Sequence, residues 1–243
     1  MENYQEQYKQ ELHQQEIRSN LQTLKGFFWI FATVLVIWVL TLLRIFIVDA
    51  GIFTMAVGMS AVIGIPIVYI YKKVDLSKQW VKYVFLTLIC MISAIFATFL
   101  SFHAVLIYVL PLLLAVQYRQ KRSLWITYFV NDITMTISML AGFYHGICDL
   151  NLLLGSNHTR SWYLEQWSAG ALQFDLEPDP IFVILFYGAL PRAVILLVFT
   201  LILRYISISG HTDAQRIADL TYRKETDLGT HVYNKNKYEE MIE

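Results

Sequence analysis

The sequence predicts an all-α integral membrane protein with about six transmembrane helices and cytoplasmic N- and C-termini. Of its 243 residues, 56% are hydrophobic and 16% are charged, whereas soluble domains are about 45 to 50% apolar and about 25% charged. Between Phe27 and Ser207 the chain contains several apolar runs near or above the ~18 residues that cross ~30 Å of hydrocarbon. The basic residues are concentrated in alternate loops, as in multi-span proteins.

Six apolar runs fit this topology, with boundaries near 27–48, 52–71, 82–101, 103–118, 124–147 and 181–206. The third and fourth runs are nearly fused, and we separate them at residues 101–103. A single helix over 82–118 would be ~55 Å long at ~1.5 Å per residue, far more than one crossing needs. Prolines inside a run are tolerated in membrane helices, and each is expected to kink its helix. They are Pro66, Pro111 and Pro191.

The lysines and arginines predict the orientation of the chain. With the N-terminus inside, the inside segments hold three, four, three and six of the 19 basic residues, and only Arg160 lies in an outside loop. Loops rich in lysine and arginine stay in the cytoplasm, so both termini are predicted to be cytoplasmic and the number of crossings to be even. The formal net charge is zero, which gives no basic field for a nucleic-acid partner.

The chain divides into four predicted regions: an N-terminal cytoplasmic helix (1–26), a six-helix membrane module (27–206), a polar linker helix (207–225) and a final segment (226–243). The N-terminal helix shows no sustained apolar stripe, so we expect it to be exposed and frayed. The membrane module has one long external loop, 149–179, which is rich in aromatic residues. Either an interfacial helix on the outer leaflet or a ligand-sensing lid fits that loop.

Three polar residues fall inside the predicted spans. Asn131 and Asp132 lie ~12 Å from the inner end of the fifth span, and Arg192 lies ~18 Å from the inner end of the sixth. Charged groups at bilayer depth cost ~2.5 to 3.5 kcal/mol and usually face a partner or a cavity. We therefore predict an ion pair between Asp132 and Arg192, which is either a structural staple or a ligand or proton site.

Metal binding is not indicated by the cysteines and histidines. Cys90 and Cys148 lie in or beside apolar runs without metal-ligand or redox spacing, and His103 and His145 lack a nearby carboxylate cluster. We predict no metal or cofactor site in this chain.

The last residues carry a resemblance to a known domain. Residues 226–242 read TDLGTHVYNKNKYEEMI and resemble the opening of a GGDEF domain, the catalytic domain of diguanylate cyclases, which begins approximately D-x-L-T-G-L-x-N-R-x-x-F. Asp227, Thr230 and Asn234 occupy matching places, and Lys235 stands where arginine is usual. Gly229 and His231 depart from the pattern.

The resemblance implies the membrane sensory and anchoring region of a diguanylate cyclase, which makes cyclic di-GMP from two GTP molecules with Mg²⁺. It implies a bacterial inner (plasma) membrane, a homodimer, and an unknown small-molecule or membrane signal. Asp227 and Lys235 are expected to hold the opening turn together. The family's catalytic residues would follow Glu243, so we expect this chain alone to be inactive.

Two other functions compete with this interpretation. A small transporter or permease is indicated by Asp132, Arg192 and the prolines, although no internal repeat is evident between 27–118 and 124–206. The sensor region of another signalling enzyme, such as a histidine kinase, would have a similar architecture. His211 is the linker's histidine, and the residues after it lack the glutamate and proline of a phosphoacceptor helix.

Overall fold

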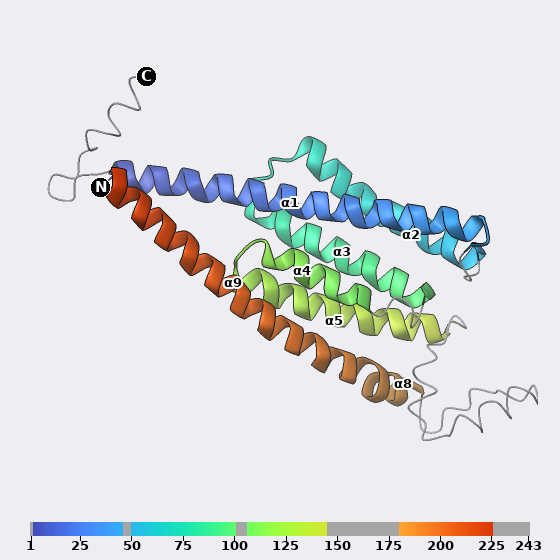
Figure 1. Ribbon diagram of the computed structural model, residues 1–243. Coiled ribbons are helices and arrows are strands. Elements are labelled where there is room, and N and C mark those ends of the chain that lie inside the picture. Colours follow the sequence, from blue (N-terminus) through green and yellow to red (C-terminus); the bar gives the residue numbers. More distant parts are fainter. Residues whose placement is uncertain (1, 46–49, 101–105, 145–179, 226–243) are drawn as a thin grey trace, which may run out of the picture.

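A computed structural model describes residues 2–45, 50–100, 106–144 and 180–225. Over these residues the chain is helical and contains no strand. Figure 1 shows the helices as an elongated bundle. In chain order they are α1 (Glu2–Leu42), α2 (Ala50–Lys73), α3 (Gln79–Leu100), α4 (Leu110–Val116), α5 (Lys121–Tyr144), α8 (Pro180–Val183), the π-helical turn η2 (Ile184–Ala189) and α9 (Leu190–Glu225).

Five of these helical stretches are long and apolar enough to cross a membrane. α3, with 22 residues, is ~33 Å long at ~1.5 Å per residue, which matches a hydrocarbon core of ~30 Å. The fourth predicted crossing is shorter in the structure, because its apolar helical stretch covers only Leu106–Val116. α4 nevertheless packs in the interior against α1, α3, α5 and α9.

The outer surface of the bundle is apolar. On α5, Phe129, Ile133 and Ile137 repeat at helical spacing and are 58%, 59% and 60% exposed. The same helix buries polar side chains on its opposite face, including Ser123, Thr127 and Asn131. An aqueous protein has the reverse arrangement, since apolar groups leave water on folding. The structure therefore supports a membrane-embedded protein.

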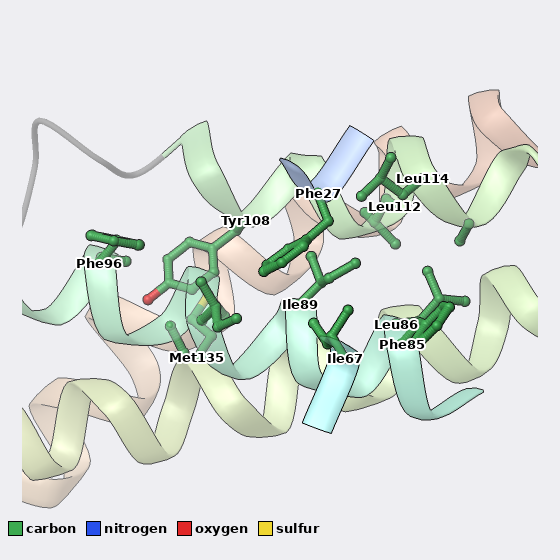
Figure 2. Packing of buried hydrophobic residues seen from close by; sticks show 14 of the residues in the cluster. Phe27, Ile67, Phe85, Leu86, Ile89, Phe96, Tyr108, Leu112, Leu114 and Met135 are labelled. Atoms are coloured by element: carbon green, nitrogen blue, oxygen red, sulfur yellow. The ribbon is translucent and has the colours of Figure 1, made fainter. Parts of the chain in front are cut away.

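The core of the bundle is formed by side chains from every long helix. Figure 2 shows Phe27 of α1, Ile67 of α2, Ile89 of α3 and Met135 of α5 in one cluster. A polar seam accompanies it between α3 and α5, where the Ser138 hydroxyl donates to the Ala94 carbonyl at 2.9 Å and also contacts the Thr98 hydroxyl. Small polar residues allow close helix approach and hydrogen bonds across helices in lipid.

The start of α1 and the end of α9 lie at the same end of the molecule, where both helices extend beyond α2 to α5 (Figure 1). This arrangement agrees with an even number of passes. α9 is a single helix of 36 residues, ~54 Å long, so the predicted linker 207–225 continues the last span without a break.

The three prolines act differently from one another. Pro66 is inside α2, as expected for a kink, because it cannot donate to the carbonyl four residues earlier. Pro111 is in the first turn of α4, where a proline interrupts no α-helical hydrogen bond, and within the longer helical stretch Leu106–Val116; a kink there stays a prediction. Pro191 is the second residue of α9, which begins where η2 ends, and a π-helical turn is itself a common site of bending.

The helix of the first predicted span, 27–48, ends before Arg44. α1 ends at Leu42, and Arg44 has a φ of 59°. The N–H of Ile45 donates to the Leu40 carbonyl and that of Arg44 to the Thr41 carbonyl, each at 3.0 Å. This is a left-handed helix C-cap, so Arg44 lies just beyond the helix instead of inside it.

Candidate functional site

A cluster of polar side chains joins α1 to two loops at the end of the bundle. α1 contributes polar residues at i, i+3 and i+4, a spacing that places them on one helix face. The bundle contributes the first turn of α3 and the loops 74–78 and 117–120. We call this cluster the clamp, and it consists of Glu16, Ser19, Asn20, Leu76, Lys82, Gln117, Tyr118 and Gln120.

Lys82 is the charged centre of the clamp. Its side chain is only 3% exposed, and its Nζ lies 2.5 Å from Oε1 of Glu16, whose side chain is 13% exposed. Nζ also donates to Oε1 of Gln120 at 2.8 Å. An ammonium removed from water needs a counter-charge and further acceptors. Glu16 and Gln120 supply them, and in doing so they tie α1, α3 and the 117–120 loop together.

Asn20 is the neutral centre of the clamp and is fully buried. Its Nδ2 donates to the Leu76 carbonyl at 2.7 Å, and its Oδ1 accepts from the Tyr118 hydroxyl at 2.8 Å. One side chain thus holds the 74–78 loop through its donor and the 117–120 loop through its acceptor. Buried polar groups in such a network are costly to leave unpaired.

Two further contacts fix α1 against the second loop and α4. The Ser19 hydroxyl donates to the Gln117 carbonyl at 3.2 Å. Two turns further along α1, Gly26 faces Leu114 so closely that a Cβ at Gly26 would lie 2.6 Å from Leu114 Cδ2. Glycine therefore permits the close approach of α1 to α4.

Packed elements connect the clamp to α9. α4 contacts both α1 and α9, and the 117–120 loop that the clamp holds connects α4 to α5. Farther along the bundle, the Tyr128 hydroxyl donates to the Ala193 carbonyl at 3.4 Å, which joins α5 to α9. α1, α4, α5 and α9 are therefore in direct contact through this part of the bundle.

The 74–78 loop carries an acid whose ionised form stabilises its turn. Asp75 accepts from the Ser77 N–H at 3.0 Å and from the Ser77 hydroxyl at 2.8 Å. These hydrogen bonds lower the pKa of Asp75 below its ordinary value of 3.8. Since Asp75 is exposed, the contribution to stability is small, but the loop it shapes also presents the Leu76 carbonyl to Asn20.

We predict a pH-dependent contribution from Asp75. A carboxylate with a lowered folded-state pKa stabilises the fold above its unfolded-state pKa, and this stabilisation is lost as the pH falls through the folded-state pKa. The melting temperature of the wild type should exceed that of Asp75→Ala at pH 7. This difference in melting temperature should shrink as the pH falls below 3.8, the ordinary pKa of an aspartate. A difference that is constant from pH 7 to pH 3 would contradict this assignment.

The expectation that the N-terminal helix is exposed and frayed is wrong for its second half. Ser19, Asn20, Thr23 and Leu24 are buried, because the helix packs against the loops through polar contacts. The signal that could have found this face is the stripe Glu16, Ser19, Asn20 and Thr23 at i, i+3, i+4 and i+7. A polar stripe, like an apolar one, can be a packing interface when its side chains find hydrogen-bond partners.

The three intramembrane polar residues lie on the α5 and α9 side of the bundle. Asn131 is fully buried, and its Nδ2 donates to the Tyr108 carbonyl at 2.8 Å, which fastens α5 to the start of the α4 region. Asp132 is half-buried, and its Oδ1 has no hydrogen-bond partner in the described chain. Arg192 Nη1 lies 3.3 Å from Met139 Sδ, two helical turns along α5 from Asp132. The Asp132–Arg192 ion pair stays a prediction.

Several predicted features lie outside the described residues. They are the segment resembling the GGDEF opening with Asp227, Thr230, Asn234 and Lys235, the external loop 149–179, and His103, His145 and Cys148. The side chain of Cys90 is buried and free.

Comparisons with known proteins return no similarity for the chain: no protein-family model, no curated protein and no solved structure matches it. Any functional conclusion therefore depends on the residues themselves.

Proposed function

We propose that this protein is the membrane sensory and anchoring region of a GGDEF-type diguanylate cyclase in a bacterial inner membrane. The observation that supports this proposal most is the continuity of α9. A helix that runs from Leu190 to Glu225 leads from the membrane directly to residues 226–242, which resemble the opening of a GGDEF domain. A continuous helix transmits a shift or rotation at the membrane to the domain that follows.

The proposed orientation places the clamp in the cytoplasm. The basic residues Lys72, Lys73, Lys78 and Arg119 all lie in or beside the two loops that α1 contacts, and lysine-rich and arginine-rich loops remain inside. α1 and α9 extend beyond the bundle at this same end (Figure 1). The signalling helix then emerges on the side where GTP is present.

In the proposed mechanism a signal at the bundle changes the clamp and the packing of α4 against α9. The movement of α9 then alters how two cytoplasmic domains meet. Joining two GTP molecules through their 3′ hydroxyls requires two facing half-sites, so the active form is a homodimer, with Mg²⁺ and GTP bound by the domain after residue 243. This chain supplies the control and the membrane anchor.

The test is a fusion of residues 1–225 to the complete GGDEF domain of a soluble cyclase, assayed for cyclic di-GMP in nanodiscs. We expect the rate in the fusion to differ from that of the free domain, and Glu16→Gln to change it further. Gln22→Ala, an exposed change on the same helix, should leave it unaltered. Equal dimerisation and equal cyclase activity with and without the membrane module would contradict the proposal.

A transporter is the second candidate, because Asp132 has a buried oxygen without a hydrogen-bond partner inside the described bundle. Ionisable residues at membrane depth often mark ion and proton pathways. Proteoliposome flux assays with wild type and Asp132→Asn distinguish the two functions. Asp132-dependent flux of protons or another ion would favour the transporter.

A further inference from the structure

A groove between α1 and α2 combines an apolar wall with a basic end. It has a volume of about 440 Å³ and is lined by residues that include Phe28, Phe31, Ile65, Val68, Lys72 and Lys73. This volume falls within the ~300 to 1,000 Å³ typical of small-molecule sites. Phe27, a core residue that is only 5% exposed, also lines the groove.

The shape of the groove follows from the sequence of α2. Gly64 lines it without a side chain, and a Cβ there would already be in contact with the Phe27 ring at 3.5 Å. Pro66 lies inside the same helix, and Figure 1 shows α2 diverging from α1 toward its Lys73 end. Proline is a common cause of such divergence. The groove is lined by α2 residues on both sides of Pro66.

The groove is apolar along its middle and basic at one end, which matches the apolar chain and the anionic headgroup of a phospholipid. Ile65 is 63% exposed and Val68 36% exposed, so the middle of the groove presents apolar surface at bilayer depth. Lys72, seven positions after Ile65, lies two helical turns or ~10 Å further toward the membrane boundary. An acyl chain along Ile65 and Val68 would bring its headgroup to Lys72 and Lys73.

The ammonium groups of Lys72 and Lys73 are available to bind an external anion. Both are exposed in the last turn of α2, and neither ammonium lies within 4.0 Å of a carboxylate among the side chains that the structure describes. The nearest acid in sequence is Asp75, whose carboxylate accepts hydrogen bonds from Ser77. Basic pockets between membrane helices on the cytoplasmic side bind anionic headgroups.

We propose that this groove is a binding site for one anionic phospholipid, with an acyl chain between α1 and α2 and the headgroup phosphate on Lys72 and Lys73. The site adjoins the 74–78 loop, which Asn20 holds in the clamp. The proposal requires only that the bundle is embedded in lipid, so it stands or falls separately from the cyclase function.

The test is native mass spectrometry of the full chain titrated with phosphatidylglycerol or phosphatidylcholine. We expect phosphatidylglycerol to bind at least tenfold more tightly and Lys72→Gln/Lys73→Gln to abolish that preference. Lys78→Gln/Lys121→Gln removes the same charge from exposed positions outside the groove and should preserve it. Ala61→Trp, which fills the groove, should weaken phosphatidylglycerol binding, whereas Val62→Trp on the neighbouring lipid-facing position should not.

Four outcomes would overturn the proposal. The first is equal affinity for the two lipids. The second is an equal loss in both double-lysine variants, which would indicate diffuse surface charge. The third is unchanged phosphatidylglycerol binding when Ala61→Trp is folded, as judged by its melting temperature. The fourth is crosslinking of groove residues to a second copy of the chain with no lipid retained. That result would show that the groove is a dimer contact and not a lipid site.

Discussion

Replacing Glu16 with glutamine should destabilise the bundle by about 3 kcal/mol, because it leaves the Lys82 ammonium buried without a counter-charge. The Lys82 side chain is 3% exposed and lies 2.5 Å from Glu16 Oε1, so it cannot regain water without opening the α1 contact. Breaking one partner of a buried pair typically costs about 3 to 5 kcal/mol, and the partial exposure of Glu16 favours the lower value. For a protein of this size the expected fall in melting temperature is about 6 to 12 °C.

A double-mutant cycle distinguishes the ion pair from simple packing. Lys82→Met removes the ammonium and keeps an apolar side chain of similar length, so Glu16→Gln/Lys82→Met should recover at least half of the loss caused by Glu16→Gln alone. Lys78→Met is the matched control, because Lys78 is exposed in the preceding loop. Additive effects of Glu16→Gln and Lys82→Met would show that the two side chains do not act as a pair.

Asn20→Ala should produce the second large effect, a loss of about 3 kcal/mol. The side chain is fully buried and makes hydrogen bonds of 2.7 Å to the Leu76 carbonyl and 2.8 Å to the Tyr118 hydroxyl. Removing it leaves two partners unsatisfied in the interior, and each such group costs about 1 to 3 kcal/mol. Thermal denaturation in detergent micelles measures the loss.

Tyr118→Phe separates the two hydrogen bonds of Asn20. It removes only the tyrosine hydroxyl, so its cost should be smaller than that of Asn20→Ala, and the pair should be non-additive. Gln22→Ala, exposed on the same helix, should change stability by less than about 0.5 kcal/mol. A similar small effect for Asn20→Ala would mean that the helix is not docked on the loops.

The helical fold could be predicted from the sequence because lipid imposes a simple rule. Each crossing must satisfy its backbone internally, so long apolar runs such as the one in α3 become helices. The same rule does not determine how polar ends pack. Asn20 and Lys82 are buried by tertiary contacts between segments 56 and 66 residues apart, and local periodicity contains no information about such distant partners.

The intramembrane residues show the same limit. The burial of Asn131 could be expected from its polarity at bilayer depth, but not its partner, the Tyr108 carbonyl. The ion pair between Asp132 and Arg192 was predicted because the two residues lie at similar depths in their spans. Which side chains meet also depends on the rotation of each helix about its axis, which the depth does not give. Arg192 Nη1 lies 3.3 Å from Met139 Sδ, a contact that depth alone does not predict. Helix starts were also not predictable from the apolar run, since α4 begins at Leu110, one residue before Pro111.

The central claim is that α9 carries the state of the bundle to the following domain as one rigid helix, and helical phase tests it most directly. In the fusion of residues 1–225 to a complete GGDEF domain, two alanines inserted after Gly210 would rotate the domain by about 200°, whereas seven would return it to within about 20°. We predict that cyclic di-GMP synthesis changes severalfold with two inserted residues and returns toward the parent rate with seven. Equal rates for both insertions and the parent fusion would contradict the account.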